Sequence, residues 1–372
     1  MTNSKVIGMK WYWKVFLGLG SLLLLILILN IGLNAWVKHQ LPKIINREND
    51  SDYFITYKNL SVSLLNSNIK ADEIVVVPKA AVKDSITKAG IYAKIHAVEV
   101  KDFKIWKLIF TDKLMAKSIT VQQPQVILYQ KKKENINNEV VKPFQKIISV
   151  SDIFVNHGDL KIINVKNNKA VLSVNNINFN LDGIVITDST LKGKIPFQFA
   201  NYTLNCDSLY YHPNDFYHIK TKRIRTTKSD LTVDKFEMLP TYSRLEFVSK
   251  LAKEKDIYTL LCDSIKISKL NWGFKNDDFY FHCNTIDLEH ASANIYRSKE
   301  PTDDLSKKHL YNKLLRELKF DLKVDTLEVR NSILEYEEEK SADFGAGKLI
   351  FNSFNLTATA INSGFKKQHF PT

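Results

Sequence analysis

The sequence predicts a mainly β protein, in which one N-terminal transmembrane helix precedes an elongated antiparallel β-sheet with two or three short helices. Two patterns predict this. A long apolar segment without charge lies near the N-terminus, and after about residue 46 apolar and polar residues alternate with a period of two. Apolar residues make up 44% of the chain, more than a disordered chain carries.

The N-terminal segment 15–37 reads VFLGLGSLLLLILILNIGLNAWV and is long enough, as a helix, to cross the hydrocarbon layer of a bilayer. Trp13 and Trp36 flank it where aromatic belts form. The alternative is a signal peptide cleaved after this segment, but no clear small-x-small cleavage site follows. The residues expected within the bilayer are Val15, Phe16, Leu22, Leu25, Ile28, Ile31, Leu33 and Trp36.

The basic residues flanking this helix do not fix its orientation. Lys5, Lys10 and Lys14 precede it, and Lys38, Lys43 and Arg47 follow it. Because the preceding tail is short and the following body is long, we expect the tail inside and the body exported. The expected organisation is a short cytoplasmic tail at 1–14, a transmembrane helix at 15–37 and an exported β-rich body at 38–372.

Period-two alternation dominates the body and indicates strands with one apolar and one solvated face. It favours a mostly antiparallel sheet, because buried parallel strands are apolar on both faces. In the segment 177–182, for example, Ile and Phe alternate with Asn. The residues expected to line the apolar face are Ile177, Phe179, Leu181, Phe320, Leu322, Val324, Leu327 and Val329.

Three short helices are predicted between the strands. Ser243 and Glu246 form a capping-box pattern. Asp303 or Asp304 is the expected cap of a second helix, which carries an apolar stripe of Leu310, Leu314 and Leu318. A weaker third candidate spans residues 139–148. We expect all three to cover or cap the sheet.

Parts of the body resemble one another. The sequence CDSL at 206–209 recurs as CDSI at 262–265, and a strand, a short break and a second strand recur from Ile119, Ile286 and Asp325. Recurrence of this kind predicts one supersecondary unit stacked along an axis. The repetition of Asp207 and Asp263 favours a structural role in turns, in which their side chains bond their own backbone.

The composition argues against several function classes. The formal charge is +13, but the Lys and Arg residues are scattered and form no module for nucleic acid. Three cysteines without C-x-x-C spacing predict no disulfide framework or zinc site, although one bridge remains possible. No catalytic, phosphate-binding or metal motif is present, so we predict a non-enzyme without cofactor or metal. The acidic run at 335–339 is expected to be solvated.

The chain resembles the AsmA-like group of envelope proteins, which includes TamB-type repeating β-groove proteins. The resemblance rests on the anchor segment, on the strand pair YKNLSVSLLNSNIKADEIVV that begins at Tyr57, and on the unit from Ile95 to Tyr129; VNHGDLKIINV from Val155 matches only loosely. It covers most of the body, and no signature motif makes it specific. The Asn- and Lys-rich composition is similar to that of Bacteroidota.

This resemblance implies a curved β-groove, a single-pass anchor in the bacterial inner membrane, and a periplasmic body that binds or transfers phospholipid or maintains the outer membrane. Relatives are often longer, which implies that a C-terminal docking part is missing. The sequence leaves two alternatives open. The apolar faces can form a trough for acyl chains, or they can close on one another as a sandwich core. The second functional hypothesis is an anchored scaffold that binds another envelope protein.

Overall fold

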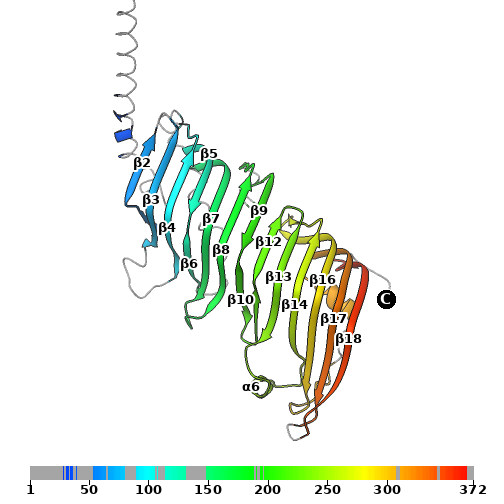
Figure 1. Ribbon diagram of the computed structural model, residues 1–372. Helices are drawn as coiled ribbons and strands as arrows, with labels where there is room; N and C mark the ends of the chain where they lie inside the picture. Colours follow the sequence, from blue (N-terminus) through cyan, green and yellow to red (C-terminus); the bar gives the residue numbers. More distant parts are fainter. Residues whose placement is uncertain are drawn as a thin grey trace, which may run out of the picture.

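The body of the protein is one large β-sheet (Figure 1). The computed structural model describes residues 28, 31–32, 34–36, 39, 53–63, 66–79, 89–104, 107, 114–130, 148–187, 190, 193–195, 197–306, 311–341 and 344–366. The first strands are β1 (Tyr53–Thr56), β2 (Asn59–Ser63), β3 (Asn68–Pro78), β4 (Gly90–Lys101), β5 (Leu114–Gln122), β6 (Gln125–Gln130), β7 (Ile148–Asn164), β8 (Ala170–Asp182) and β9 (Asn201–Cys206). The remaining strands are β10 (Ser208–Asn214), β11 (Tyr217–Thr221), β12 (Arg223–Thr227), β13 (Leu231–Pro240), β14 (Ile257–Ser268), β15 (Asn271–Lys275), β16 (Asp278–Ser298), β17 (Asp321–Glu339) and β18 (Ala346–Asn362).

The predicted transmembrane helix lies mostly outside the described residues. Ile28, Ile31 and Trp36 are described; all three are helical and exposed. The other expected membrane residues, Val15, Phe16, Leu22, Leu25 and Leu33, are outside the described part of the chain. No helix within the described residues is long and apolar enough to span a membrane.

The strands follow one another across the sheet nearly in sequence order (Figure 1). Several positions in the sheet hold two short strands end to end: β5 and β6 both pair with β4 on one side and with β7 on the other. In the same way β9 and β10 lie beside β8, and β12 and β11 lie between them and β13. Strands β14, β16, β17 and β18 complete the sheet, with β15 paired to the first residues of β16.

The sheet is mixed, which corrects the prediction of an antiparallel sheet. Strands β5 and β6 run parallel to β7, and β16 runs parallel to β17. The connections before β7 and β17 are long, at 131–147 and 299–320, as a parallel connection requires. Period-two alternation does not reveal strand direction, because one solvated face gives the same pattern in both arrangements.

Helix α6 (Arg244–Ser249) confirms the predicted capping box. The Ser243 side chain accepts a hydrogen bond from the Glu246 amide, and the Glu246 carboxylate accepts one from the Ser243 amide. The second predicted helix is α7 (Tyr311–Arg316). Asp304 does not cap it directly, since its carboxylate accepts from the Ser306 amide. Of the third candidate, residues 139–147 lie outside the described residues and Ile148 begins β7.

One buried cluster among the described residues lies where α6 meets the strand ends. We call it the α6 corner: Phe247, Val248, Ile257 and Tyr296, of which Phe247, Ile257 and Tyr296 are each 3% exposed. Arg244 anchors the helix through two hydrogen bonds to the buried carboxylate of Glu337, at 2.6 and 2.9 Å. These bonds lower the pKa of Glu337 to about 2.

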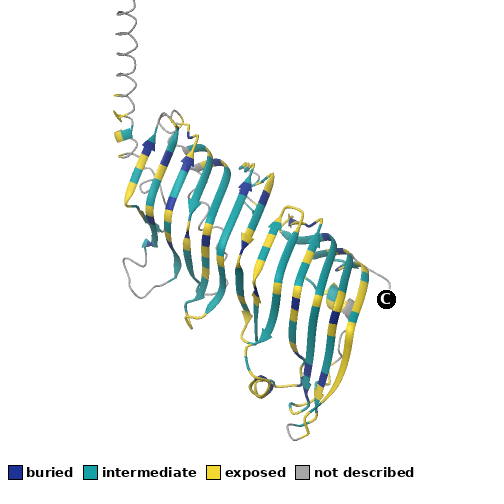
Figure 2. Ribbon diagram, viewed as in Figure 1, coloured by how far each residue is buried: buried dark blue, intermediate teal, exposed yellow. Residues whose placement is uncertain are grey.

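Away from this corner the sheet is a single layer. Almost every residue of β8, β13 and β16 is partly buried, whichever face it occupies (Figure 2). In α7, Leu314 is 49% exposed and Leu315 is partly buried. The described strands all belong to one sheet, so no second sheet of the described residues lies against the long apolar face.

Candidate functional site

One face of the sheet is apolar along its whole width. Residues paired across neighbouring strands share a face, so the strand register shows which side chains lie in one row. One unbroken row, which follows these pairings from β3 to β18, is Ala71, Val98, Val121, Val155, Phe179, Leu204, Thr226, Leu231, Ile267, Ile286, Leu327 and Ala358. Thr226 is its one polar member, and a threonine side chain still presents a methyl group.

A second apolar row runs across the other half of the strands. Its members, again paired in order, are Ile91, Leu128, Ile162, Leu172, Tyr211, Ile219, Met238, Leu260, Ala293, Leu334 and Phe351. We call the surface formed by these two rows the apolar face.

The opposite face is polar. The row one residue away from the first apolar row consists, from β9 to β18, of Asn205, Arg225, Thr232, Lys266, Asp287, Glu328 and Thr357. Ion pairs cross it, such as Arg225 with Asp234 at 3.5 Å and Arg330 with Asp287 at 3.1 Å. The sheet is thus amphipathic as a whole, with its charges solvated on one side.

The residues predicted to line the apolar face fall in two strands. Phe179 and Leu181 of β8 line an open apolar pocket, and Ile177 lies next to them in the same strand. In β17, Leu327 and Val329 pair with Ile286 and Leu288. Leu322 pairs with Phe281, which lines the same pocket, and Val324 is 4% exposed. Phe320 precedes β17 and packs on Phe279, with the ring centroids 5.6 Å apart.

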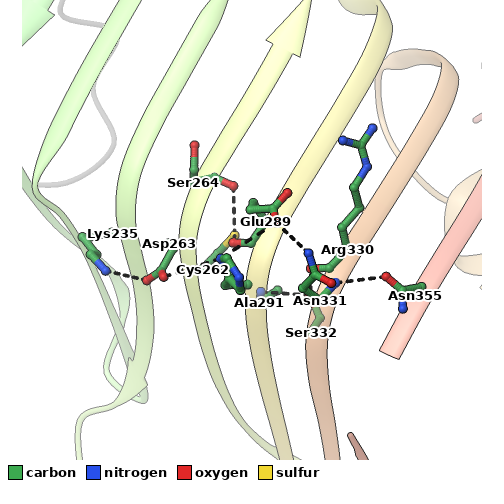
Figure 3. Close-up of polar contacts among 11 residues, drawn as sticks. Lys235, Cys262, Asp263, Ser264, Glu289, Ala291, Arg330, Asn331, Ser332 and Asn355 are labelled. Atoms are coloured by element: carbon green, nitrogen blue, oxygen red, sulfur yellow. Dashed lines mark hydrogen bonds and ion pairs between the residues drawn. The ribbon is translucent and has the colours of Figure 1, made fainter. Parts of the chain in front are cut away.

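A polar row divides the two apolar rows. We call it the crease, and its residues are Glu73, His96, Gln123, His157, Asn176, Asp207, Lys235, Asp263, His290, Asn331 and Ser353. Eight of them have φ between 48° and 55°, the left-handed region that few side chains other than Asn, Asp and His adopt readily. Figure 3 shows Lys235, Asp263, Glu289 and Asn331 in a line across neighbouring strands.

Hydrogen bonds along the crease replace ladder bonds that the left-handed residues disrupt. The backbone N–H of Asn331 donates to Asn355 Oδ1 at 3.0 Å, and the backbone N–H of Asn176 donates to Asp159 Oδ1 at 3.0 Å. Lys235 Nζ donates to Asp263 Oδ1 at 2.6 Å (Figure 3). The first two contacts satisfy backbone N–H groups, and the third is an ion pair between side chains.

The crease keeps both apolar rows on one face. A left-handed residue shifts the alternation of a strand by one position, as in a β-bulge. In β8, Leu172 and Val174 are therefore followed by Ile177 and Phe179, with a spacing of three in place of two. Because each strand carries the shift at the same level, pairing continues in register on both sides: Val233 pairs with Ile265 and Met238 with Leu260.

The crease also explains the internal repeats seen in the sequence. The breaks in the repeated segments are crease positions within strands or between end-to-end strands. The turn hypothesis required the side chains of Asp207 and Asp263 to bond their own backbone. Their hydrogen bonds go elsewhere: Asp207 accepts from Asn176 Nδ2 at 2.6 Å, and Asp263 accepts from Lys235 Nζ. Cys206 and Cys262, which precede them, are free and buried, and burial raises the pKa of both thiols.

The apolar face contains an open pocket of about 630 Å³. Its floor is formed by β8, β9, β12, β13, β15 and β16, and Ile195, Phe197 and Phe199 from the segment between β8 and β9 form one margin. Trp272 Nε1 donates to Tyr202 Oη at 2.8 Å, and the two rings meet edge to face. The contact between Tyr202 and Trp272 was not predicted from the sequence, because these residues come from separate segments that only the pairing of the strands between them brings together.

The described residues contain no group of three or more His, Cys, Asp and Glu side chains placed to hold a metal ion. The chemistry available on the apolar face is burial of apolar surface. No family model and no curated protein matches this chain.

Proposed function

We propose that this chain is a membrane-anchored, non-enzymatic envelope protein that holds the acyl chains of phospholipid on its apolar face. The observation that carries the proposal is the apolar row from Ala71 to Ala358, against which no second sheet of the described residues packs. Exposed apolar patches much larger than a few hundred Å² mark binding surfaces in soluble proteins.

The energetics suit a ligand that is itself long and apolar. Burying each methylene group contributes about 0.8 kcal/mol, so a surface that carries acyl chains must stay apolar along its length. A charged residue within either row would interrupt this gain, and neither row contains one. Together with the N-terminal segment 15–37, this supports the AsmA-like hypothesis of an inner-membrane anchor and a periplasmic body for lipid transfer or outer-membrane maintenance.

The first test compares two adjacent residues of β9 that face opposite sides. In Leu204→Asp a carboxylate enters the apolar row, whereas in Thr203→Asp it enters the polar face. Full-length protein is purified in mild detergent, and bound phospholipid is quantified by mass spectrometry. We expect Leu204→Asp to bind at least about fivefold less lipid, because an unpaired charge against acyl chains is strongly unfavourable. Thr203→Asp should bind as much as the unmodified protein.

Uptake of a fluorescent phospholipid from vesicles provides the second measurement. Unmodified protein that carries no lipid and takes up none overturns the proposal. Equal loss in both variants, with unchanged circular dichroism, also contradicts it, since the two faces would then be equivalent.

The second candidate function is an anchored scaffold, and the edge strand β18 favours it. In the described residues β18 pairs only with β17, and Leu349, Ile350 and Phe351 are 55%, 48% and 47% exposed. A long apolar edge is a template for a strand of another protein. A photo-crosslinker at Ile350 and another at Leu204 separate the two functions: protein adducts at Ile350 without lipid adducts at Leu204 favour the scaffold.

A further inference from the structure

A polar pocket of about 460 Å³ adjoins the apolar pocket. Its polar lining includes Lys194 and Gln198 from the segment between β8 and β9, and Asn276 and Asp277 from the turn between β15 and β16. This pocket lies at the margin of the sheet, where a bound amphiphile would present its headgroup to water.

The two pockets share a wall. Ile195 and Phe197 line both of them. Phe274 of the polar pocket also packs on Phe279 of the apolar pocket, with ring centroids 5.5 Å apart. A single molecule with an apolar chain and a polar head can therefore occupy both pockets at once.

The polar pocket is held on both sides by backbone structure. Asn276 and Asp277 both have positive φ and form a two-residue turn closed by the pairing of Lys275 with Asp278. On the other side, Gln198 and Val185 exchange two backbone hydrogen bonds of 2.9 Å. The groups in the pocket are thus carried by a tight hairpin and by a segment tied to the sheet.

The charges in the pocket balance. Among the described lining residues Lys194 is the one cation and Asp277 the one anion, and Gln198 and Asn276 contribute amides. Asp278, the next residue, lies outside the pocket lining and pairs with Lys366. A ligand that suits this pocket carries one negative and one positive group.

We infer that the pocket receives a phospholipid headgroup that contains both a phosphate and an ammonium group, and that it selects this headgroup over a purely anionic one. Lys194 pairs with the phosphate and Asp277 with the ammonium group. A headgroup without an ammonium group leaves Asp277 beside a negative ligand, and such repulsion is a common source of specificity. This inference rests on the proposed function and names its preferred substrate.

The test is a competition between two lipids. Full-length protein in detergent is mixed with vesicles of phosphatidylethanolamine and phosphatidylglycerol in equal amounts, and the bound lipids are quantified by mass spectrometry. We expect phosphatidylethanolamine to be enriched by about threefold over the vesicle ratio, the range of a partly solvated ion pair. Asp277→Asn, which keeps a residue that tolerates positive φ, should abolish the enrichment without lowering the total lipid bound.

The matched control is Asp215→Asn, in the exposed turn between β10 and β11 and outside the pocket. It should retain the enrichment. Bound lipid at the vesicle ratio in the unmodified protein overturns the headgroup inference and leaves lipid carriage standing. Absence of bound lipid overturns the proposed function itself, so the two failures are distinguishable.

Discussion

The α6 corner and the apolar face use the same residue types in opposite ways. At the corner a helix covers Phe247 and Tyr296, which are each 3% exposed. On the apolar face Phe179, Leu204 and Leu231 remain partly buried. The chain therefore builds a closed core at the α6 corner, and it also buries Ile69 and Val100 near the first strands, while the middle of the apolar face stays partly exposed. This difference separates side chains that a helix covers from side chains of the same types that stay partly exposed on the apolar face.

The largest loss of stability should come from removing a buried side chain at the α6 corner. Phe247→Ala removes a ring whose centroid lies 4.9 Å from that of Phe216 and 5.6 Å from that of Tyr217. We expect a loss of about 3–5 kcal/mol in the free energy of unfolding, measured by urea denaturation. Leu204→Ala on the apolar face should lose about 1 kcal/mol or less in lipid-free protein, because its side chain is already partly exposed. Similar losses at both sites would contradict the contrast between the corner and the face.

Breaking the ion pair that anchors α6 should have the next largest effect. Arg244→Met leaves the buried Glu337 carboxylate without its main partner, and we expect a loss of about 2 kcal/mol at pH 7 after allowance for the exposure of Arg244. Hydrogen exchange of the backbone amides of α6 measures this loss of stability.

The sign of the pH dependence follows from the lowered pKa of Glu337, about 2 in the folded protein against 4.5 for an ordinary Glu. The stabilisation is complete above pH 4.5 and disappears as the pH falls towards 2. The gap between Arg244→Met and the unmodified protein should therefore close over this range. A gap that stays constant down to pH 2 would falsify the assignment to this ion pair.

Substitution of a crease residue should have a smaller effect on stability, and two variants at one position separate the contribution of the backbone conformation from that of the side chain. Asn176 has φ of 52°. Asn176→Gly and Asn176→Val both lose the side-chain bond to Asp207, but only valine resists the left-handed conformation. We expect the valine variant to be less stable than the glycine variant by about 1–2 kcal/mol in urea denaturation. Equal stability of the two variants would show that the shift in alternation does not depend on this backbone conformation.

The smallest effect on stability should come from breaking an exposed ion pair of the crease. Lys235→Met removes the ion pair with Asp263, in which both side chains are about half exposed. Water and salt screen such pairs, so we expect no measurable change in urea denaturation at physiological ionic strength. A clear loss of stability would mean that the crease is held by its charges as well as by its backbone.

The strands and their apolar positions were predictable, because alternation is a local property of the sequence. Phe179 and Leu181 were expected on the apolar face, and they line its pocket. The capping box at Ser243 was equally local. The contact between Tyr202 and Trp272 was not predictable, since the two residues are far apart in sequence and meet only after the strands between them have paired.

The sequence by itself determined that this is a β protein with one apolar and one polar face, since side chains of a strand alternate whatever its neighbours are. Only the tertiary structure decided that β16 and β17 run parallel, that breaks such as Asn176 and Asn331 align in one crease, and that no second sheet of the described residues packs on the apolar face. The reason is physical: strand direction and register depend on which distant segments pair, and a single strand carries no record of its partner.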